Sequence, residues 1–123
     1  MRGPPLHPTT LALCLIVSAC ATPQQRASAQ DSLLSGVGFT AQPANTPERS
    51  AALASLPPNK IVQEAHDGSV RYVYADPLVC GCLYFGDQAA YGRYKQEVAK
   101  RQLAKEQAEA EQLRQNTWDE RPP

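Results

Sequence analysis

The amino-acid sequence predicts an α+β fold, in which a small domain combines a short helix, a β-hairpin plus short strands, and a long polar C-terminal helix. Three observations lead to this prediction. A capping threonine and a proline open a helix at residues 46–48, the turn dipeptide Asp67-Gly68 separates two strand-like segments, and strong helix formers dominate from Gln88 onward. A chain of 123 residues forms one domain at most.

The charge balance of the chain argues against a nucleic-acid partner. Lysine plus arginine and aspartate plus glutamate each number 12, so there is no basic field to attract an anionic polymer. The sequence also lacks a G-x-S-x-G motif, paired histidines and a glycine-rich phosphate loop. We therefore expect a non-enzymatic protein with no small-molecule substrate.

Residues 1–19 have the pattern of a signal peptide. A short positive start with Arg2 precedes a nearly unbroken apolar run over residues 9–17. A run of roughly ten residues is too short to span a bilayer, which needs about 20. No second apolar run follows, so we expect no transmembrane segment.

The end of this run, Val17-Ser18-Ala19-Cys20, resembles the lipobox of bacterial lipoproteins. The resemblance implies cleavage before Cys20, a covalent lipid on its thiol in place of any cofactor, and a membrane anchor. Ala21 follows the cysteine where aspartate would retain such a protein at the inner membrane, which favours the periplasmic face of the outer membrane. Two alternatives stay open: ordinary signal peptidase could cut after Ala21, or the run could remain as an uncleaved anchor.

The region after the cysteine divides into three parts. Residues 20–30 lack large apolar side chains, and we expect them to be a flexible tether. We expect residues 31–95 to form the α+β domain. Residues 96–123 should form a projecting polar helix and a disordered tail. Within the domain, a helical turn at 31–35 and a short strand near Phe39 come first. The helix opened at 46–48 ends at Pro57-Pro58, and its Leu53 and Leu56 should pack on the hairpin that follows.

The hairpin flanking Asp67-Gly68 has a predictable register. A two-residue turn there places Glu64 opposite Arg71, and opposite charges directly across a ladder stabilise it. One face of the hairpin is the better core candidate; it carries Ile61, Ala65, Val70, Tyr72 and Tyr74.

Beyond the hairpin, the sequence predicts a turn at Asp76-Pro77, a third strand over 79–85 and a helix from Gln88 to about Asn116, with Asp87 as its cap. The apolar stripe of this helix should dock on the sheet and consists of Tyr91, Tyr94 and Val98. Further along, the helix lacks an apolar seam, which favours a solvated helix over a coiled coil.

Cys80 and Cys82 form a Cys-Gly-Cys motif whose chemistry the sequence leaves open. An oxidising compartment favours a disulfide, although in an extended strand the two Cα atoms stand about 6.6 Å apart, so Gly81 would have to kink the backbone. Two thiolates could instead bind zinc or cuprous copper, but the nearest histidine, His66, lies at the far end of the hairpin. Two further hypotheses are that the thiols are buried and inert or that they form a redox-active pair.

A set of short motifs between residues 36 and 95 resembles a group of small, uncharacterised proteobacterial lipoproteins. The motifs are Gly38-Phe39, Thr46-Pro47-Glu48-Arg49, Leu56-Pro57-Pro58, Tyr74-Ala75-Asp76-Pro77, Cys80-Gly81-Cys82-Leu83-Tyr84 and Ala90-Tyr91 to Tyr94. The resemblance implies an envelope location and a similar shape, but no activity. The helix-and-hairpin arrangement is also loosely similar to the small accessory lipoprotein of the β-barrel assembly machinery, an analogy without motif matches. The expected partners are the membrane, through the lipid, and an unknown periplasmic or envelope protein.

The lipobox yields a first prediction. Replacing the acyl acceptor by Cys20→Ser should abolish both acylation and cleavage by the lipoprotein peptidase, because a hydroxyl does not substitute for the thiol. Mass spectrometry of the purified envelope protein would measure lipid mass and cleavage point together. A wild-type protein that carries no lipid and begins at Thr22 would contradict the lipobox interpretation.

Overall fold

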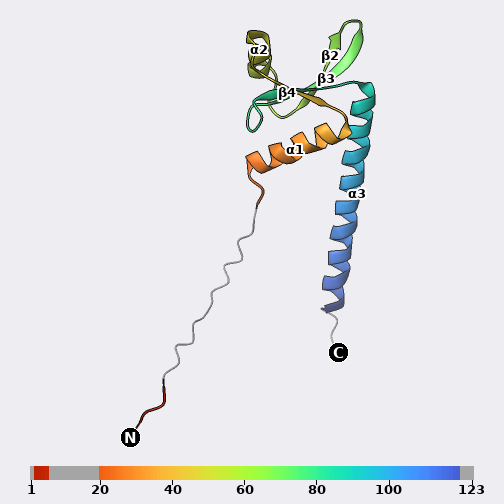
Figure 1. The fold of residues 1–123 in the computed structure, drawn as a ribbon. Coiled ribbons are helices and arrows are strands. Elements are labelled where there is room, and N and C mark those ends of the chain that lie inside the picture. Colours follow the sequence, from red (N-terminus) through yellow and green to blue (C-terminus); the bar gives the residue numbers. More distant parts are fainter. Residues whose placement is uncertain (1, 6–19, 120–123) are drawn as a thin grey trace.

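The computed structural model describes residues 2–5 and 20–119, and the rest of the predicted signal peptide and residues 120–123 lie outside these residues. The α+β class is confirmed (Figure 1). In chain order the elements are α1 (Pro23–Val37), β1 (Thr40–Pro43), α2 (Pro47–Ser55), β2 (Ile61–His66), β3 (Ser69–Asp76), β4 (Cys82–Gly86) and α3 (Gln88–Asp119).

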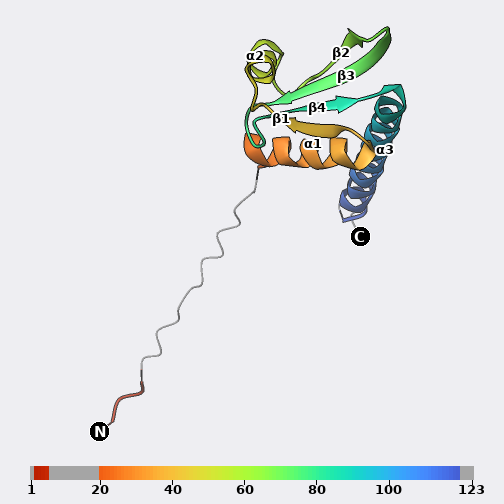
Figure 2. The same ribbon diagram turned by 45° about the horizontal axis from the view of Figure 1, so that its top comes forward.

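The strands described by the structure form one antiparallel sheet in the order β1-β4-β3-β2. Helices α1 and α3 cover one face of this sheet and α2 covers the other, as Figures 1 and 2 show. The tip of the β2–β3 hairpin extends beyond the helices, and α3 projects away from the sheet (Figure 1).

Both faces of the central strands are buried, and the face named as the better core candidate is one of them. The face under α1 and α3 holds Tyr72 and Tyr74 as predicted, but Ala65 and Val70 lie exposed near the hairpin tip, beyond the reach of the helices. The opposite face buries Val73 and Ala75, which pack with Leu83 against the apolar side of α2. Central strands covered on both sides must carry apolar residues at consecutive positions, so alternation alone cannot identify the core face.

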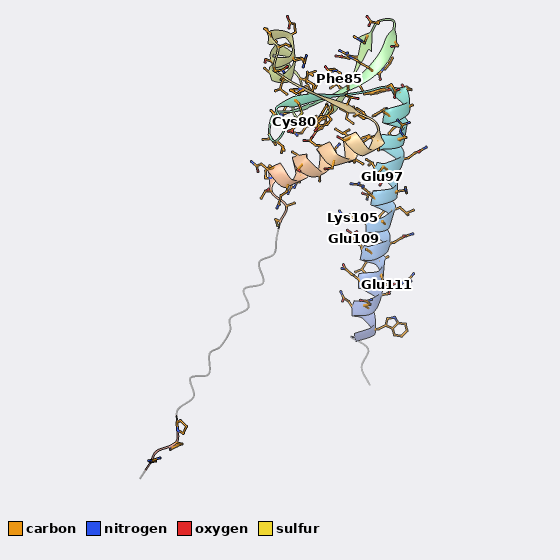
Figure 3. All side chains as sticks on the ribbon, viewed as in Figure 1. Cys80, Phe85, Glu97, Lys105, Glu109 and Glu111 are labelled. Atoms are coloured by element: carbon orange, nitrogen blue, oxygen red, sulfur yellow. A yellow bond between two sulfur atoms is a disulfide. The ribbon has the colours of Figure 1, made fainter. Side chains whose placement is uncertain are left out.

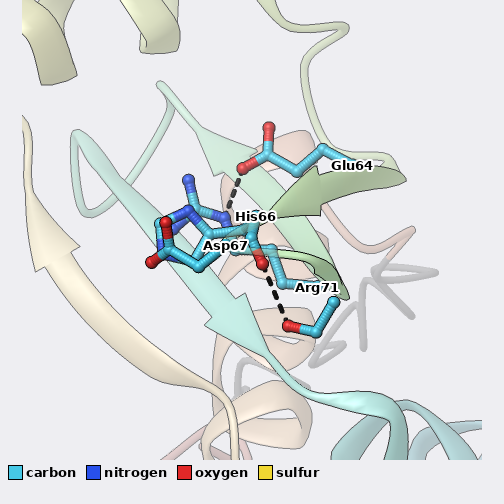
Figure 4. A network of polar contacts seen from close by, with 5 residues as sticks. Glu64, His66, Asp67 and Arg71 are labelled. Atoms are coloured by element: carbon cyan, nitrogen blue, oxygen red, sulfur yellow. Dashed lines mark hydrogen bonds and ion pairs between the residues drawn. The ribbon is translucent and has the colours of Figure 1, made fainter.

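The predicted hairpin register is confirmed residue by residue. Glu64 pairs with Arg71 across the ladder, and their side chains form an ion pair (Figure 4). Arg71 also lies over the ring of Phe85, 4.5 Å from its centroid. The turn residues Asp67 and Gly68 have φ values of 48° and 75°, the positive range that this dipeptide tolerates.

Helix α2 also follows the sequence prediction. Thr46 caps it by accepting a hydrogen bond from the backbone N–H of Arg49, and Pro47 occupies its first turn. Leu53 and Leu56 pack against the face that buries Val73, Ala75 and Leu83, as expected for a short helix that cannot be stable alone.

The flexible tether predicted for residues 20–30 is wrong from residue 23 onward, because α1 begins at Pro23 and contains the predicted 31–35 turn. Thr22 caps the helix in a reciprocal box: its hydroxyl accepts from the Gln25 N–H, and its own N–H donates to the Gln25 side chain. The helix ends at Gly38, whose φ of 106° is the left-handed conformation that terminates many helices.

Two further boundaries differ from the prediction. Strand β4 starts at Cys82 instead of residue 79, because residues 77–80 form a turn. Helix α3 continues to Asp119, three residues beyond the predicted end, so the disordered tail predicted for this region does not begin before residue 120. Tyr91 and Tyr94 do pack on the core, whereas Val98 is 41% exposed and only the first two positions of the predicted stripe dock.

The contact between Gly86 of β4 and Phe39, the residue before β1, generates a stability prediction. A Cβ added at Gly86 would stand 2.6 Å from the ring of buried Phe39, so Gly86→Ala should lower the free energy of unfolding by about 1–3 kcal/mol. Gly92 in α3 is the matched control, because a Cβ there meets nothing within 4 Å, and Gly92→Ala should raise stability by roughly 0.5–1 kcal/mol. Urea denaturation would measure both changes. Equal stability of the two variants would show that Phe39 does not pack as described.

Candidate functional site

Cys20, the predicted acyl acceptor, is exposed and lies directly before the folded domain. Only Ala21 separates it from Thr22, the cap of α1. A chain of three residue steps reaches at most about 11 Å, so any group attached to Cys20 stays close to the first turn of α1. Val17, Ser18 and Ala19, the rest of the predicted lipobox, lie outside the described residues.

Cys80 and Cys82 are joined by a disulfide across the turn between β3 and β4. Their Cα atoms are 5.1 Å apart, closer than in an extended strand, and Gly81 adopts a φ of 62° between them. The kink that the motif would need is therefore present. Cys80 is exposed and Cys82 is fully buried, so the bridge ties a surface turn to the core.

The same turn is held from inside by the side chain of Asp76, which is completely buried. Its carboxylate accepts hydrogen bonds from the backbone N–H groups of Leu78 at 2.9 Å, Val79 at 3.2 Å and Cys80 at 2.7 Å. Asp76 therefore stabilises the turn, the role that the Asp-Pro sequence suggests.

Asp31 of α1 lies against Asp76 in the interior and is 8% exposed. Burial, together with the hydrogen bond and the negative charge of Asp76, raises the pKa of Asp31 to about 6. Burial also disfavours the charged form of Asp76, but the N–H groups of the turn and the hydrogen bond with Asp31 outweigh it and lower its pKa. The pair thus shares its charge unequally, with Asp76 ionised and Asp31 the carboxyl that holds a proton more readily.

Tyr84 of β4 completes this buried polar group. Burial and the adjacent Asp31 raise the pKa of Tyr84 to about 12, so its hydroxyl stays neutral and can hydrogen-bond Asp31. One oxygen of Asp31, Oδ1, is buried without a hydrogen-bond partner among the described residues. A cluster enclosed in this way joins α1 to the sheet and offers little access to a substrate.

Sequence reasoning missed Asp31 as part of the interior. A helical pattern extended back to Pro23 would have revealed it, because Ala27, Asp31 and Leu34 recur at the four- and three-residue spacing of one helix face. The flexible-tether assignment hid this spacing. The pairing of Asp31 with Asp76 had no local signal.

An open cavity of about 430 Å³ lies beside the disulfide turn and the start of α1. Two tyrosine hydroxyls are fixed in its wall: Asn59 donates to Tyr74 at 2.9 Å, and Gln30 donates to Tyr94 at 3.1 Å. The full lining is Pro23, Arg26, Ala27, Gln30, Asn59, Tyr74, Leu78 and Tyr94.

The described residues contain no group of three or more histidine, cysteine, aspartate or glutamate side chains arranged to hold a metal ion. In the disulfide form, neither Cys80 nor Cys82 presents a thiolate. His66 lies at the hairpin tip, where its ring contacts Asp67 at 3.1 Å. A metal would therefore require prior reduction of the bridge and further ligands.

Comparison with protein-family models, curated proteins and solved structures finds no match to this chain. Across residues 2–5 and 20–119, no helix is both long and apolar enough to cross a membrane. The candidate features are those that the geometry singles out: Cys20, the disulfide turn and the buried carboxyl pair.

The buried carboxyl pair generates a pH prediction. The folded pKa of Asp31, about 6, lies above its ordinary value of 3.8, so the folded state binds this proton more tightly than the unfolded state. The stabilisation that Asp31 contributes is therefore full below about pH 4 and is lost as the pH rises through 6. Asp31→Asn keeps the shape of the protonated aspartate side chain but cannot ionise. It should raise the free energy of unfolding by roughly 1–3 kcal/mol at pH 7.5, with little gain at pH 4.

Asp76→Asn is the matched control for this experiment. It removes the charge that the N–H groups of the turn stabilise, and should cost about 1–3 kcal/mol at pH 7.5. Urea denaturation of the wild type and both variants at the two pH values measures the effect. If Asp31→Asn destabilises the protein at pH 7.5 as Asp76→Asn does, the assignment of the proton to Asp31 is wrong.

Proposed function

We propose that this chain is a lipid-anchored lipoprotein of the bacterial cell envelope that acts as a non-enzymatic interaction protein facing the periplasm. The observation that carries the proposal is the junction at Cys20. The cysteine that ends the lipobox is exposed and stands two residues before the cap of the first helix. Acyl chains on Cys20 would hold the domain at a membrane surface, and the alanine at position 21 favours the outer membrane.

The surface best suited to a partner is α3. Beyond its docked first turns, nearly all of its side chains are exposed, and charged residues such as Lys105, Glu109 and Glu111 project from it (Figure 3). Ion pairs along the helix, including Arg101 with Glu97 and Lys105 with Glu109, support a helix that stands in solvent. Because this helix lacks an apolar seam, a partner would meet a mostly charged surface, with Leu103 and Leu113 as isolated apolar contacts.

A second candidate is a redox or metal-binding lipoprotein that uses Cys80 and Cys82. The observation favouring it is the asymmetry of the disulfide, with Cys80 exposed at the surface turn and Cys82 buried. Such exposure would let an external thiol reach one sulfur. Elemental analysis and thiol counting of protein purified with and without reductant would distinguish this candidate, because only it requires reversible reduction or bound metal.

Photo-crosslinking tests the interaction proposal in intact envelopes. A photoreactive residue at Leu103 or Leu113 should give a discrete adduct, because these side chains lie on the proposed partner surface. The matched control is Val70, which is also exposed but lies near the hairpin tip and should give none. Immunoblotting and mass spectrometry would detect the adducts. Absence of adducts at both α3 positions, or equal labelling at Val70, would argue against α3 as the partner surface.

A further inference from the structure

The turn that leads into the disulfide, residues 77–80, exposes two aliphatic side chains, Leu78 and Val79. Their exposed fractions are 48% and 50%, although they are adjacent residues in a short turn. The turn is held rigid by the carboxylate of Asp76 on one side and by the Cys80–Cys82 bridge on the other. About half of each residue therefore faces solvent at a fixed position, where it can contact another surface.

This turn lies at the same end of the domain as Cys20. Leu78 shares the wall of the 430 Å³ cavity with Pro23 and Arg26, which belong to the first turn of α1. Both ribbon views place the β3–β4 turn beside the start of α1 (Figures 1 and 2). Because Cys20 is three residues before Pro23, an acyl group on Cys20 would bring Leu78 and Val79 to the bilayer as well.

We propose that the β3–β4 turn is a second membrane contact, in which Leu78 and Val79 enter the interface of the bilayer that holds the acyl chains of Cys20. This inference rests on the proposed lipid anchor. The anchor keeps the turn near the bilayer at a high effective concentration, so two aliphatic side chains suffice for an orienting contact. Arg26, in the first turn of α1, supplies a cation at the depth of the phosphate groups.

Such a contact would fix the orientation of the domain. Helix α1 would run away from the bilayer, and its 15 residues span about 22 Å. Helix α3 meets the far end of α1, where the Arg93 side chain donates to the carbonyl of Val37 at 2.8 Å. The partner surface proposed on α3 would therefore be held off the lipid.

Fluorescence quenching by brominated lipids tests this contact in the full, natively processed protein. In a Trp118→Phe background, Leu78→Trp places a reporter in the turn, and Val70→Trp places one near the hairpin tip at the opposite end of the sheet. The proteins are reconstituted into phosphatidylethanolamine–phosphatidylglycerol vesicles with or without bromine on the acyl chains. Apolar side chains of interfacial proteins lie roughly 5–10 Å into the headgroup–acyl boundary, so the Leu78→Trp emission should fall about twofold with bromine while the Val70→Trp emission stays unchanged.

Mass spectrometry of the same preparations separates the two proposals. Lipid mass on Cys20 with equal quenching at the two positions would overturn the membrane contact and leave the lipoprotein proposal standing. Absence of lipid mass would overturn both. Emission from Leu78→Trp that responds to protein concentration but not to bromine would mean that a second copy covers the turn, which also contradicts the proposal. Val79→Trp, checked by circular dichroism, repeats the test if Leu78→Trp fails to fold.

Discussion

The buried carboxylate of Asp76 is the group on which the rest of the structure depends. It ends β3, accepts the N–H groups of the following turn and meets Asp31 from α1. A buried charge is tolerated only when it is fully hydrogen-bonded, and three backbone donors with Asp31 meet that requirement. The turn geometry that results brings Cys80 and Cys82 together and leaves Leu78 and Val79 at the surface. One side chain thus links the strand, the disulfide turn and the first helix.

Apolar side chains on both faces of the central strands explain why a chain this small needs helices on both sides of its sheet. Strands β3 and β4 bury Tyr74, Leu83 and Val73 almost completely, and these side chains point to opposite faces. An uncovered face would expose these residues to water, so α1 and α3 are required on one side and α2 on the other. The Tyr72 ring stacks on Tyr91 at 3.9 Å between centroids, which locks the start of α3 to the sheet.

Local signals in the sequence were sufficient for several elements. The Asp67-Gly68 turn and the facing charges of Glu64 and Arg71 predicted the hairpin register correctly, because a two-residue turn leaves only one way to pair the strands. The same kind of signal at Thr22-Pro23, with Gln25 completing the capping box, marked the start of α1. This capping signal was overlooked because the first turns of α1 carry few apolar residues. The burial of this helix comes from its contact with the sheet.

Other features depend on contacts between distant residues and had no local signal. The burial of the second face could not be read from alternation, because α2 covers a side of the hairpin that alternation alone marks as solvent-facing. Strand β4 starts late because Asp76, which pairs with Cys82 in the ladder, draws residues 77–80 into a turn. The pairing of Asp31 with Asp76 joins positions 45 residues apart. Of the candidate site, the Cys-Gly-Cys motif was visible in the sequence, whereas the buried acid that shapes its turn was not.

The correction at α1 also changes the physical meaning of the proposed anchor. A flexible tether of ten or so residues would let the domain turn freely above the bilayer, since a random chain of that length reaches about 16–19 Å. With α1 capped at Thr22, an acyl group on Cys20 acts within two residues of a rigid helix. Lipid attachment would then limit the orientation of the domain as well as its location. An exposed aliphatic turn beside the anchor point can select one of the remaining orientations, and the polar helix at the other end of α1 would face away from the bilayer.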